Sequence, residues 1–170
     1  DHPEWYALVD GERRPGSQLS ICTSNPDAVK TVVANVLAYL GENPETNIVG
    51  VIPQDGYGLC QCDECRKLDD SPANVFKPRG NSKTFEGQNG DKVRRYALLL
   101  NEVAGAVRKE YPDVLVGAAA YVDLLLPPMD IELADNIVPW VAIYWRCSAH
   151  PIASDSCRAN RFFHDVLRQW

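Results

Sequence analysis

Apolar residues recur at helical spacing soon after the start of the chain. From Val29 to Leu40, valines and leucines occupy the i, i+3, i+4 and i+7 positions that form one buried face of an α-helix. Asn25 before this stretch is a favourable helix cap, and Gly41 after it is a common helix terminator. The pattern therefore predicts a helix that begins after Asn25 and ends near Gly41.

The same periodicity predicts two further helices. The first buries a face that begins at Val93; Asp91 is its expected cap, and Pro112 follows its end. Arg94 and Arg95 are expected on its outer, solvated face. The second begins at a cap on Asn160 and turns the following residues inward: Phe162, Phe163, Val166, Leu167 and Trp170.

Four short apolar runs predict β-strands over residues 19–22, 47–52, 114–121 and 137–145. Runs without polar alternation are typical of parallel strands that are covered on both faces. Strands and helices alternate along the chain, and this order indicates a parallel α/β fold. Two architectures fit it: an open doubly wound sheet, or part of an eight-stranded (β/α)8 barrel of the TIM type.

Composition and charge narrow the classes of protein to which the chain can belong. The 170 residues are 45% apolar and 24% charged, which suits a globular protein, and we treat residues 1–170 as a single domain. The chain has 17 Lys and Arg against 23 Asp and Glu, a net charge of −6 without a basic cluster, so nucleic acid is not an expected partner. No apolar run approaches the roughly 18–20 residues of a membrane-spanning helix, so no membrane span is expected.

The carboxyl ends of parallel strands meet at one edge of a sheet, which is where α/β proteins bind their ligands. Asp55 directly follows the second predicted strand, so it is our candidate for a catalytic acid or base, or for a carboxylate that orients a sugar hydroxyl. A structural interpretation is equally open, because Asp55 and Gly56 also suit a turn in which the carboxylate accepts backbone hydrogen bonds. The candidate substrate-binding residues at this edge are Tyr57, Tyr121, Asp123, Trp145, Arg146 and His150.

Aromatic side chains at this edge suit carbohydrate, because the C–H faces of a pyranose ring are apolar enough to prefer an aromatic partner to water. The candidate sugar platforms are Tyr57, Tyr121, Tyr144 and Trp145. Packing in the core is the alternative interpretation of each, and for Tyr144 it is the preferred one. Arg146 or His150 would bind a uronate or a hydroxyl group. We therefore expect a carbohydrate substrate at this edge of the sheet.

Six cysteines are present, and three of them form a C-x-C-x2-C group at Cys60, Cys62 and Cys65. Thiolates at this spacing can share one tetrahedral Zn²⁺, but a structural site needs a fourth ligand. Cys22 is our candidate for that ligand, because its loop is expected at the same edge of the predicted sheet. Such a zinc would be structural, and no cofactor is expected to be required for catalysis.

The competing interpretation of the cysteines is a set of disulfides. Cys147 and Cys157 would form one bridge, and the other four cysteines would form two more. Cys147, Cys157 and His150 are also alternatives to Cys22 as the fourth zinc ligand. Both interpretations remain open, because sequence spacing alone fixes neither a disulfide pairing nor a ligand set.

Taken together, several of these motifs resemble a known family. They are His2 to Gly11, Cys22-x-Ser24-Asn25-Pro26, Asp55-Gly56-Tyr57-Gly58-x-Cys60-x-Cys62-x-x-Cys65 and Arg146-Cys147…His150-Pro151…Cys157…Asn160. They resemble a bacterial family whose members carry a domain of unknown function beside carbohydrate-degradation modules. That family is similar to the barrel glycoside hydrolases of the α-glucuronidase and β-hexosaminidase kind.

The resemblance implies a fold, an activity and a location. The implied fold is a (β/α)8 barrel of which this chain is the central part, with the remainder of the same polypeptide as its partner. The implied activity is hydrolysis of a glycosidic bond in a polysaccharide or glycan. The implied location is secreted or periplasmic.

One position departs from the pattern of these hydrolases. In the hexosaminidase-like enzymes the fourth strand ends in an adjacent Asp-Glu pair, whereas the comparable position here is Asp55-Gly56. Glycoside hydrolysis uses two carboxyl groups about 5–5.5 Å or 6.5–9.5 Å apart. The second acid would have to come from Asp123, from Asp155 or from strands beyond Trp170. The alternative function is therefore a non-catalytic glycan-binding module with a scaffold stabilised by cysteine or zinc.

Overall fold

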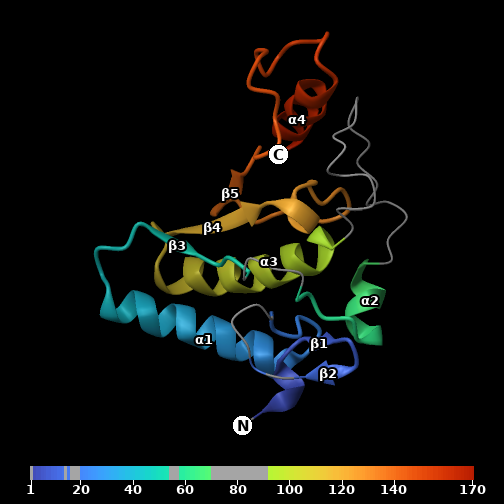
Figure 1. Cartoon of the computed structure of the whole chain (residues 1–170). Helices are drawn as coiled ribbons and strands as arrows, with labels where there is room; N and C mark the ends of the chain where they lie inside the picture. The colour runs from blue at the N-terminus through green and yellow to red at the C-terminus, as the bar shows by residue number, and fades with distance from the viewer. Residues whose placement is uncertain (1, 14, 16–19, 54–57, 70–91) are drawn as a thin grey trace.

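The computed structural model describes residues 2–13, 15, 20–53, 58–69 and 92–170, and a three-stranded parallel sheet lies at its centre. The strands are β3 (Ile48–Gly50), β4 (Leu115–Ala120) and β5 (Ile137–Val141), with β4 in the middle. Helix α3 (Val93–Glu110) packs on the sheet, and α1 (Pro26–Glu42) packs against α3 (Figure 1). The described chain is therefore a mixed α/β protein with parallel strands, as the alternation of apolar segments predicts.

All three strands run in the same direction, so their carboxyl ends meet at one edge of the sheet. In the register, Gly50 pairs with Gly117, and Ala120 pairs with Val141. The predicted strands at 47–52, 114–121 and 137–145 are confirmed, and each is shorter than the apolar run that contains it.

The run at residues 19–22 was expected as a fourth parallel strand, and its described residues do not join this sheet. Ile21 instead makes an isolated antiparallel bridge with Tyr6, and the amide of Ala7 donates to the carbonyl of Ser20 at 2.8 Å. So short a run does not by itself specify its pairing partner. The expectation that Cys22 emerges beside the other parallel strands is therefore wrong.

The first two predicted helices are confirmed, with differences at their ends. Asn25 caps α1, because its side-chain oxygen accepts hydrogen bonds from two amides of the first turn, both at 3.0 Å. Gly41 lies inside the last turn rather than ending the helix, which continues to Glu42. Helix α3 ends before Pro112 as expected, whereas its expected cap, Asp91, lies outside the described residues.

The main core lies between these helices and the sheet. Val103 and Val107 of α3 and Val116 of β4 are fully enclosed, and Leu40 brings α1 into the same cluster. Burial of an aliphatic side chain of this size stabilises a fold by about 1.5–3 kcal/mol. The valines expected on the inner face of α1 are partly buried and pack against this cluster.

Tyr96 of α3 fastens two strands near the carboxyl edge of the sheet. Its hydroxyl donates to the carbonyl of Val51 and accepts a hydrogen bond from the amide of Ala119 at 3.1 Å. Burial raises the pKa of Tyr96 to about 12. One phenol therefore satisfies a backbone group at the end of β3 and another within β4.

The N-terminal residues form a small hairpin apart from the main sheet. A 3-10 helix (Pro3–Trp5) leads into β1 (Leu8–Val9), which pairs antiparallel with β2 (Glu12–Arg13). Asp10 and Gly11 have positive φ angles of 51° and 83°, as a tight two-residue hairpin turn requires. Asp10 and Gly11 therefore form the turn that joins β1 to β2.

Helix α4 (Arg158–Gln169) packs beyond β5, at the C-terminal side of the molecule (Figure 1). It begins after Cys157, so Asn160, the expected cap, lies inside its first turn. Phe163 is fully buried as expected, whereas Leu167 is 38% exposed instead of facing inward. None of the helices in the described ranges has the length and apolarity needed to cross a bilayer.

The face of the sheet opposite α3 carries exposed apolar side chains. Ile48, Val138 and Trp140 are 54%, 40% and 72% exposed. The register puts Val138 beside Gly117 and Trp140 beside Ala119. In the described part of the chain this face, which we call the open sheet face, has small residues at its centre and large apolar ones at its margins.

Candidate metal centre

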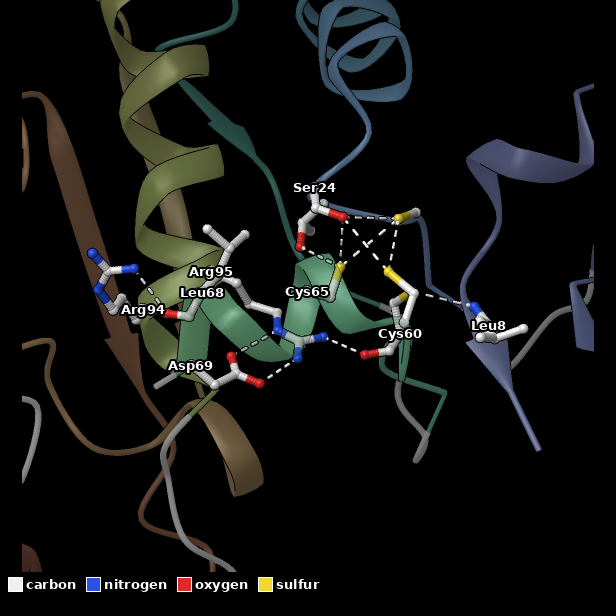
Figure 2. A network of polar contacts seen from close by, with 11 residues as sticks. Leu8, Ser24, Cys60, Cys65, Leu68, Asp69, Arg94 and Arg95 are labelled. Carbon is white, nitrogen blue, oxygen red and sulfur yellow. Dashed lines mark hydrogen bonds and ion pairs between the residues drawn. The ribbon is translucent and has the colours of Figure 1, made fainter. Parts of the chain in front are cut away.

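Four cysteine thiols come together from two distant parts of the chain. Cys22 lies just before the cap of α1, Cys60 and Cys62 precede α2 (Asp63–Asp69), and Cys65 belongs to the first turn of α2. Their Sγ atoms all lie within 4.8 Å of one another, and Figure 2 shows the sulfur atoms converging beside Ser24. These are the four cysteines that the sequence analysis grouped as a candidate zinc site, and we call them the four-thiol cluster.

The sulfur–sulfur distances in this cluster suit metal ligation. Cys22 Sγ lies 3.7 Å from Cys62 Sγ and 3.8 Å from Cys65 Sγ. In a tetrahedral site with Zn–S bonds of about 2.3 Å, neighbouring sulfur atoms are about 3.8 Å apart. All four cysteines are free thiols, and all but Cys62 are buried. The cluster could therefore bind a metal ion such as zinc after small side-chain movements.

Backbone and hydroxyl groups surround these sulfur atoms. The amide of Leu8 in β1 donates to Cys60 Sγ at 3.3 Å. Ser24 Oγ lies 3.3 Å from Cys22 Sγ and 3.2 Å from Cys65 Sγ. Partners of this kind orient the first ligands of a metal site and fix their geometry.

A buried arginine ties the cluster to the helical layer. Arg95 of α3 is 2% exposed; it donates to the carbonyl of Cys60 at 2.6 Å and makes two hydrogen bonds to the carboxylate of Asp69 (Figure 2). Burial opposes the charge of Arg95, but the contact with Asp69 outweighs it and raises the arginine pKa. Because Cys60 precedes α2 and Asp69 ends it, one guanidinium holds both ends of this helix against α3.

The thiols of the cluster do not hold their protons equally. A hydrogen bond with Cys60 holds the pKa of Cys65 well below the usual thiol value against the effect of burial, and Ser24 and Thr23 add to this lowering. The same hydrogen bond, together with burial, raises the pKa of Cys60. Cys65 is therefore the preferred thiolate of the pair. Metal binding requires every ligating thiol to lose its proton, so it weakens as the pH falls.

A second group of ligand atoms lies at the start of α4. Cys147, His150 and Cys157 place two sulfur atoms and one imidazole nitrogen within 4.8 Å of one another. A Cys147–Cys157 disulfide was one of the two interpretations left open by the sequence, and both residues are free thiols in this structure. His150 was expected to bind substrate; its Nδ1 atom lies 3.2 Å from Cys147 Sγ, and this contact lowers the pKa of Cys147 to about 7.

Two of the predicted sugar-binding residues meet beyond the carboxyl edge of the sheet. The rings of Tyr121, after β4, and Trp145, after β5, stack with centroids 5.9 Å apart and planes inclined by 8°. Tyr144, which was expected in the core, is instead 73% exposed and packs edge-on against Trp145 with ring centroids 5.3 Å apart. Val122, next to Tyr121, has a φ angle of 49°, which is strained for a β-branched residue.

The other predicted substrate-site residues are spread along the chain. Asp55 and Tyr57 lie outside the described residues. Asp123 belongs to a 3-10 helix (Val122–Leu124) directly after β4. Arg146 is exposed in the loop after β5. The contact between predicted substrate-site residues beyond the carboxyl edge is therefore the stacked pair of Tyr121 and Trp145.

Sequence reasoning missed the roles of Arg95 and Asn160. Arg95 was expected in solvent, but it lies four residues before the buried Leu99 and so shares that inner helical face. Asn160 was expected to cap α4, but its amide binds the preceding loop instead. The helical spacing to Leu99 was a usable signal for Arg95. The loop contacts of Asn160 had no local signal, because they depend on how that loop folds back.

Comparison with known proteins identifies a family for this chain. The family model described as "Domain of unknown function (DUF4838)" matches residues 1–170, the whole of this chain. No curated protein and no solved structure matches the chain. Functional conclusions therefore depend on the geometry of the sites described above.

Proposed function

The chain belongs to the DUF4838 family, and we propose that Cys22, Cys60, Cys62 and Cys65 form a structural zinc site in it. The observation that carries this proposal is the pair of sulfur–sulfur distances at Cys22, 3.7 and 3.8 Å. They match the edge of a tetrahedron built from four zinc–thiolate bonds. Four protein ligands leave no position for a substrate, which is typical of a structural rather than a catalytic zinc.

The proposed zinc would stabilise a part of the fold that has little apolar core of its own. The buried residues of this region are Ala7 and three of the cysteines themselves. A bound ion would join the N-terminal hairpin, the start of α1 and helix α2 in one unit. Because the unfolded chain lacks a preformed site, the free energy of zinc binding would add to the free energy of folding.

Metal analysis of purified protein tests this proposal. Cys62 is the least buried of the four, so Cys62→Ser is the variant that should disturb packing least. We expect the variant, prepared under reducing conditions, to lose one zinc per chain by mass spectrometry and to unfold at a lower temperature. Thr31→Ser, a conservative change on α1 outside both groups of ligand atoms, is the control and should leave the zinc content unchanged.

Two results would contradict the zinc proposal. The first is an unchanged zinc content in Cys62→Ser. The second is a parent chain whose four cysteines are found in disulfides when peptides are mapped without reductant. Disulfide bonding would support the alternative in which these cysteines stabilise the scaffold covalently.

A second candidate function, glycan binding or glycoside hydrolysis, is supported by the Tyr121–Trp145 pair. Stacked aromatic rings beyond the carboxyl edge of parallel strands suit a pyranose face. The strained Val122 beside them supports the same location, since backbone strain is concentrated at functional sites. In this proposal Asp55 is the acid, the base or the carboxylate that orients a sugar.

The open sheet face supports the (β/α)8 barrel part of this proposal. Helices cover the outside of such a barrel, and the inner face of each strand contacts other strands. Ile48, Val138 and Trp140 would face that interior, covered by further strands of the same polypeptide. We propose a secreted or periplasmic location with this function, because the carbohydrate resemblance implies it.

Assays of glycan binding and of hydrolysis test this second candidate function and distinguish the role of Trp145 from that of Asp55. Trp145→Ala should weaken binding of the protein to a panel of polysaccharides at least about tenfold if the ring stacks on sugar. Tyr39→Ala, an exposed tyrosine on α1, is the control. Asp55→Asn should abolish hydrolysis but keep glycan binding. Unchanged hydrolysis in this variant would show that Asp55 is not catalytic. Glycan binding by Trp145→Ala equal to that of the parent would show that Trp145 does not stack on sugar.

A further inference from the structure

The loop before α4 carries ligand atoms that neither the four-thiol cluster nor the aromatic pair uses. Cys147 and His150 lie in that loop, and Cys157 ends it. Two thiols and an imidazole are a ligand set that zinc binds in proteins. They lie within 4.8 Å of one another although up to ten residues separate them. Such convergence of a short, polar loop needs a physical cause.

Asn160 supplies that cause from inside α4. Its side chain is fully buried; Oδ1 accepts from the amide of Cys147 at 2.8 Å. Its Nδ2 atom is 3.0 Å from the carbonyl of Cys147, 2.8 Å from that of His150 and 3.0 Å from that of Pro151. One side-chain amide thus holds the backbone at Cys147 and at His150, two of the three proposed ligands. A rigid backbone of this kind preorganises a metal site.

The position of Cys157 is a second, independent observation. Cys157 is the N-cap residue of α4, where Ser, Thr, Asp or Asn usually caps a helix with its side chain. Its side chain makes no capping hydrogen bond, and it is 8% exposed. The thiol instead contributes to the group with Cys147 and His150. The N-terminal end of a helix also favours a negatively charged ligand such as a thiolate.

We propose that Cys147, His150 and Cys157 bind a second Zn²⁺, with water as the fourth ligand. The proposal is independent of the four-thiol cluster. For a tetrahedral ion, a sulfur and a nitrogen ligand are about 3.6 Å apart. The observed distance from Cys147 Sγ to His150 Nδ1 is 3.2 Å, so a shift of the exposed imidazole by a few tenths of an ångström suffices.

The fourth position is assigned to water because the group is open on one side. His150 is exposed and Cys147 is partly exposed, whereas Cys157 is buried. Among the described residues, no fourth ligand atom joins the three within 4.8 Å. Zinc sites with three protein ligands keep an exchangeable position that takes water or a small anion. The four-thiol cluster would therefore be closed by four protein ligands, whereas the second site would keep one exchangeable position.

Metal stoichiometry in matched variants tests the proposal on the full chain under reducing conditions. We expect the parent to bind two zinc ions and the double variant Cys147→Ser/Cys157→Ser to bind one. His150→Ala, which alters an exposed side chain, should lower the affinity for the second zinc at least about tenfold. Even residues that only contact the ligands of a metal site have effects of this size. His164→Ala on α4 is the control and should leave both ions bound.

Cobalt in place of zinc tests the ligand set directly. The difference between the spectra of the parent and the double variant should show sulfur-to-cobalt charge transfer from two thiolates, about half the intensity expected from four. Azide should shift this difference spectrum, because it can replace water at an exchangeable position. The four-thiol site, which is closed, should not respond to azide.

Three outcomes would overturn the second zinc site or its open position. Equal zinc content in the parent and the double variant would remove the site. A disulfide-linked peptide pair that contains Cys147 and Cys157, found in zinc-loaded protein, would show that these cysteines form a disulfide instead of a zinc site. A cobalt difference spectrum that does not change with azide would show that the fourth position is not occupied by an exchangeable water. Failure of the four-thiol proposal is distinguishable, because Cys62→Ser then leaves the zinc content unchanged.

Discussion

The buried side chain of Asn160 contacts four backbone groups in the loop before α4: one amide donates to its Oδ1 atom, and three carbonyls share the two hydrogens of its Nδ2 atom. In Asn160→Asp the carboxylate keeps the acceptor for the amide of Cys147 but loses every donor. Carbonyl groups left without a donor in the interior cost about 1–3 kcal/mol each. We therefore expect the free energy of unfolding to fall by at least about 2 kcal/mol, measured by urea denaturation.

Asn101 provides the matched control for this variant. Its side chain also bridges backbone groups, donating to Glu132 and accepting from Ala134, both at 2.9 Å, but in a more exposed position. Water can replace these hydrogen bonds, so Asn101→Asp should cost clearly less. Equal losses in the two variants would show that burial of Asn160 is not what makes its hydrogen bonds important.

Tyr96 predicts a pH dependence with a defined sign. Burial raises its pKa from 10.0 to about 12, so the folded chain keeps the proton more firmly than the unfolded chain does. The corresponding stability is present below pH 10 and is lost as the pH rises through about 12. Since one pKa unit equals about 1.36 kcal/mol, the loss approaches 2–3 kcal/mol.

The measurement for Tyr96 is urea denaturation at a series of alkaline pH values. Tyr96→Phe should be less stable than the parent at neutral pH, because Val51 and Ala119 lose their shared partner. It should also lose less stability between pH 10 and 12 than the parent does. Tyr39→Phe, exposed on α1, should follow the parent; a parallel decline in all three proteins would contradict the assignment to Tyr96.

At the scale of elements, α2 is held to α3 by a buried ion pair rather than by an apolar face. Arg95→Leu would leave the carboxylate of Asp69 without its main partner in a position where it is 13% exposed. Removal of one member of a buried pair typically costs about 3–5 kcal/mol. We expect a loss of that size in the free energy of unfolding, together with weaker zinc retention by the four-thiol cluster.

The control for Arg95 is the surface pair of Arg108 and Asp135, whose side chains are 44% and 81% exposed. An ion pair in solvent contributes at most about 1 kcal/mol. Arg108→Leu should therefore change the free energy of unfolding little and leave the zinc content unchanged. If both arginine variants retain zinc equally, α2 does not depend on Arg95 for its position.

Local signals were sufficient to predict the long elements. Helix α1 has an N-cap and a periodic apolar face, and both are properties of neighbouring residues. Helix α2 was missed because five of its seven residues are charged and its buried position depends on Cys65 and on an arginine from α3. The run at 19–22 was misassigned because strand pairing is a long-range choice that such a short segment does not encode.

In the candidate sites, too, local sequence predicted some features, and others depended on contacts between distant residues. Cysteine spacing was enough to group Cys60, Cys62 and Cys65, and Cys22 joins them in the structure. The reason given for Cys22, a neighbouring parallel strand, is wrong, since an antiparallel bridge at Ile21 brings it there. The group of Cys147 with His150 depends on the fold of a loop around a buried amide, which no spacing rule describes.

At the scale of the whole molecule, the open sheet face predicts association behaviour. Val138 and Trp140 are 40% and 72% exposed, so replacing both with Thr should change the free energy of unfolding by no more than about 1 kcal/mol. The variant should self-associate less than the parent in light scattering, because contiguous exposed apolar surface promotes contacts between chains. Unchanged self-association would show that the open sheet face does not mediate contacts between chains.

The four-thiol cluster also joins residues that are far apart in sequence. Cys22 and Cys62 are 40 residues apart, and α1 and β3 lie between them. A cross-link that closes a loop of this length restricts the unfolded chain by an amount equivalent to about 4 kcal/mol. An ion bound early would therefore shorten the conformational search that brings β3 to β4. Refolding with zinc present from the start should be faster than refolding in a chelator, a difference that stopped-flow fluorescence would measure.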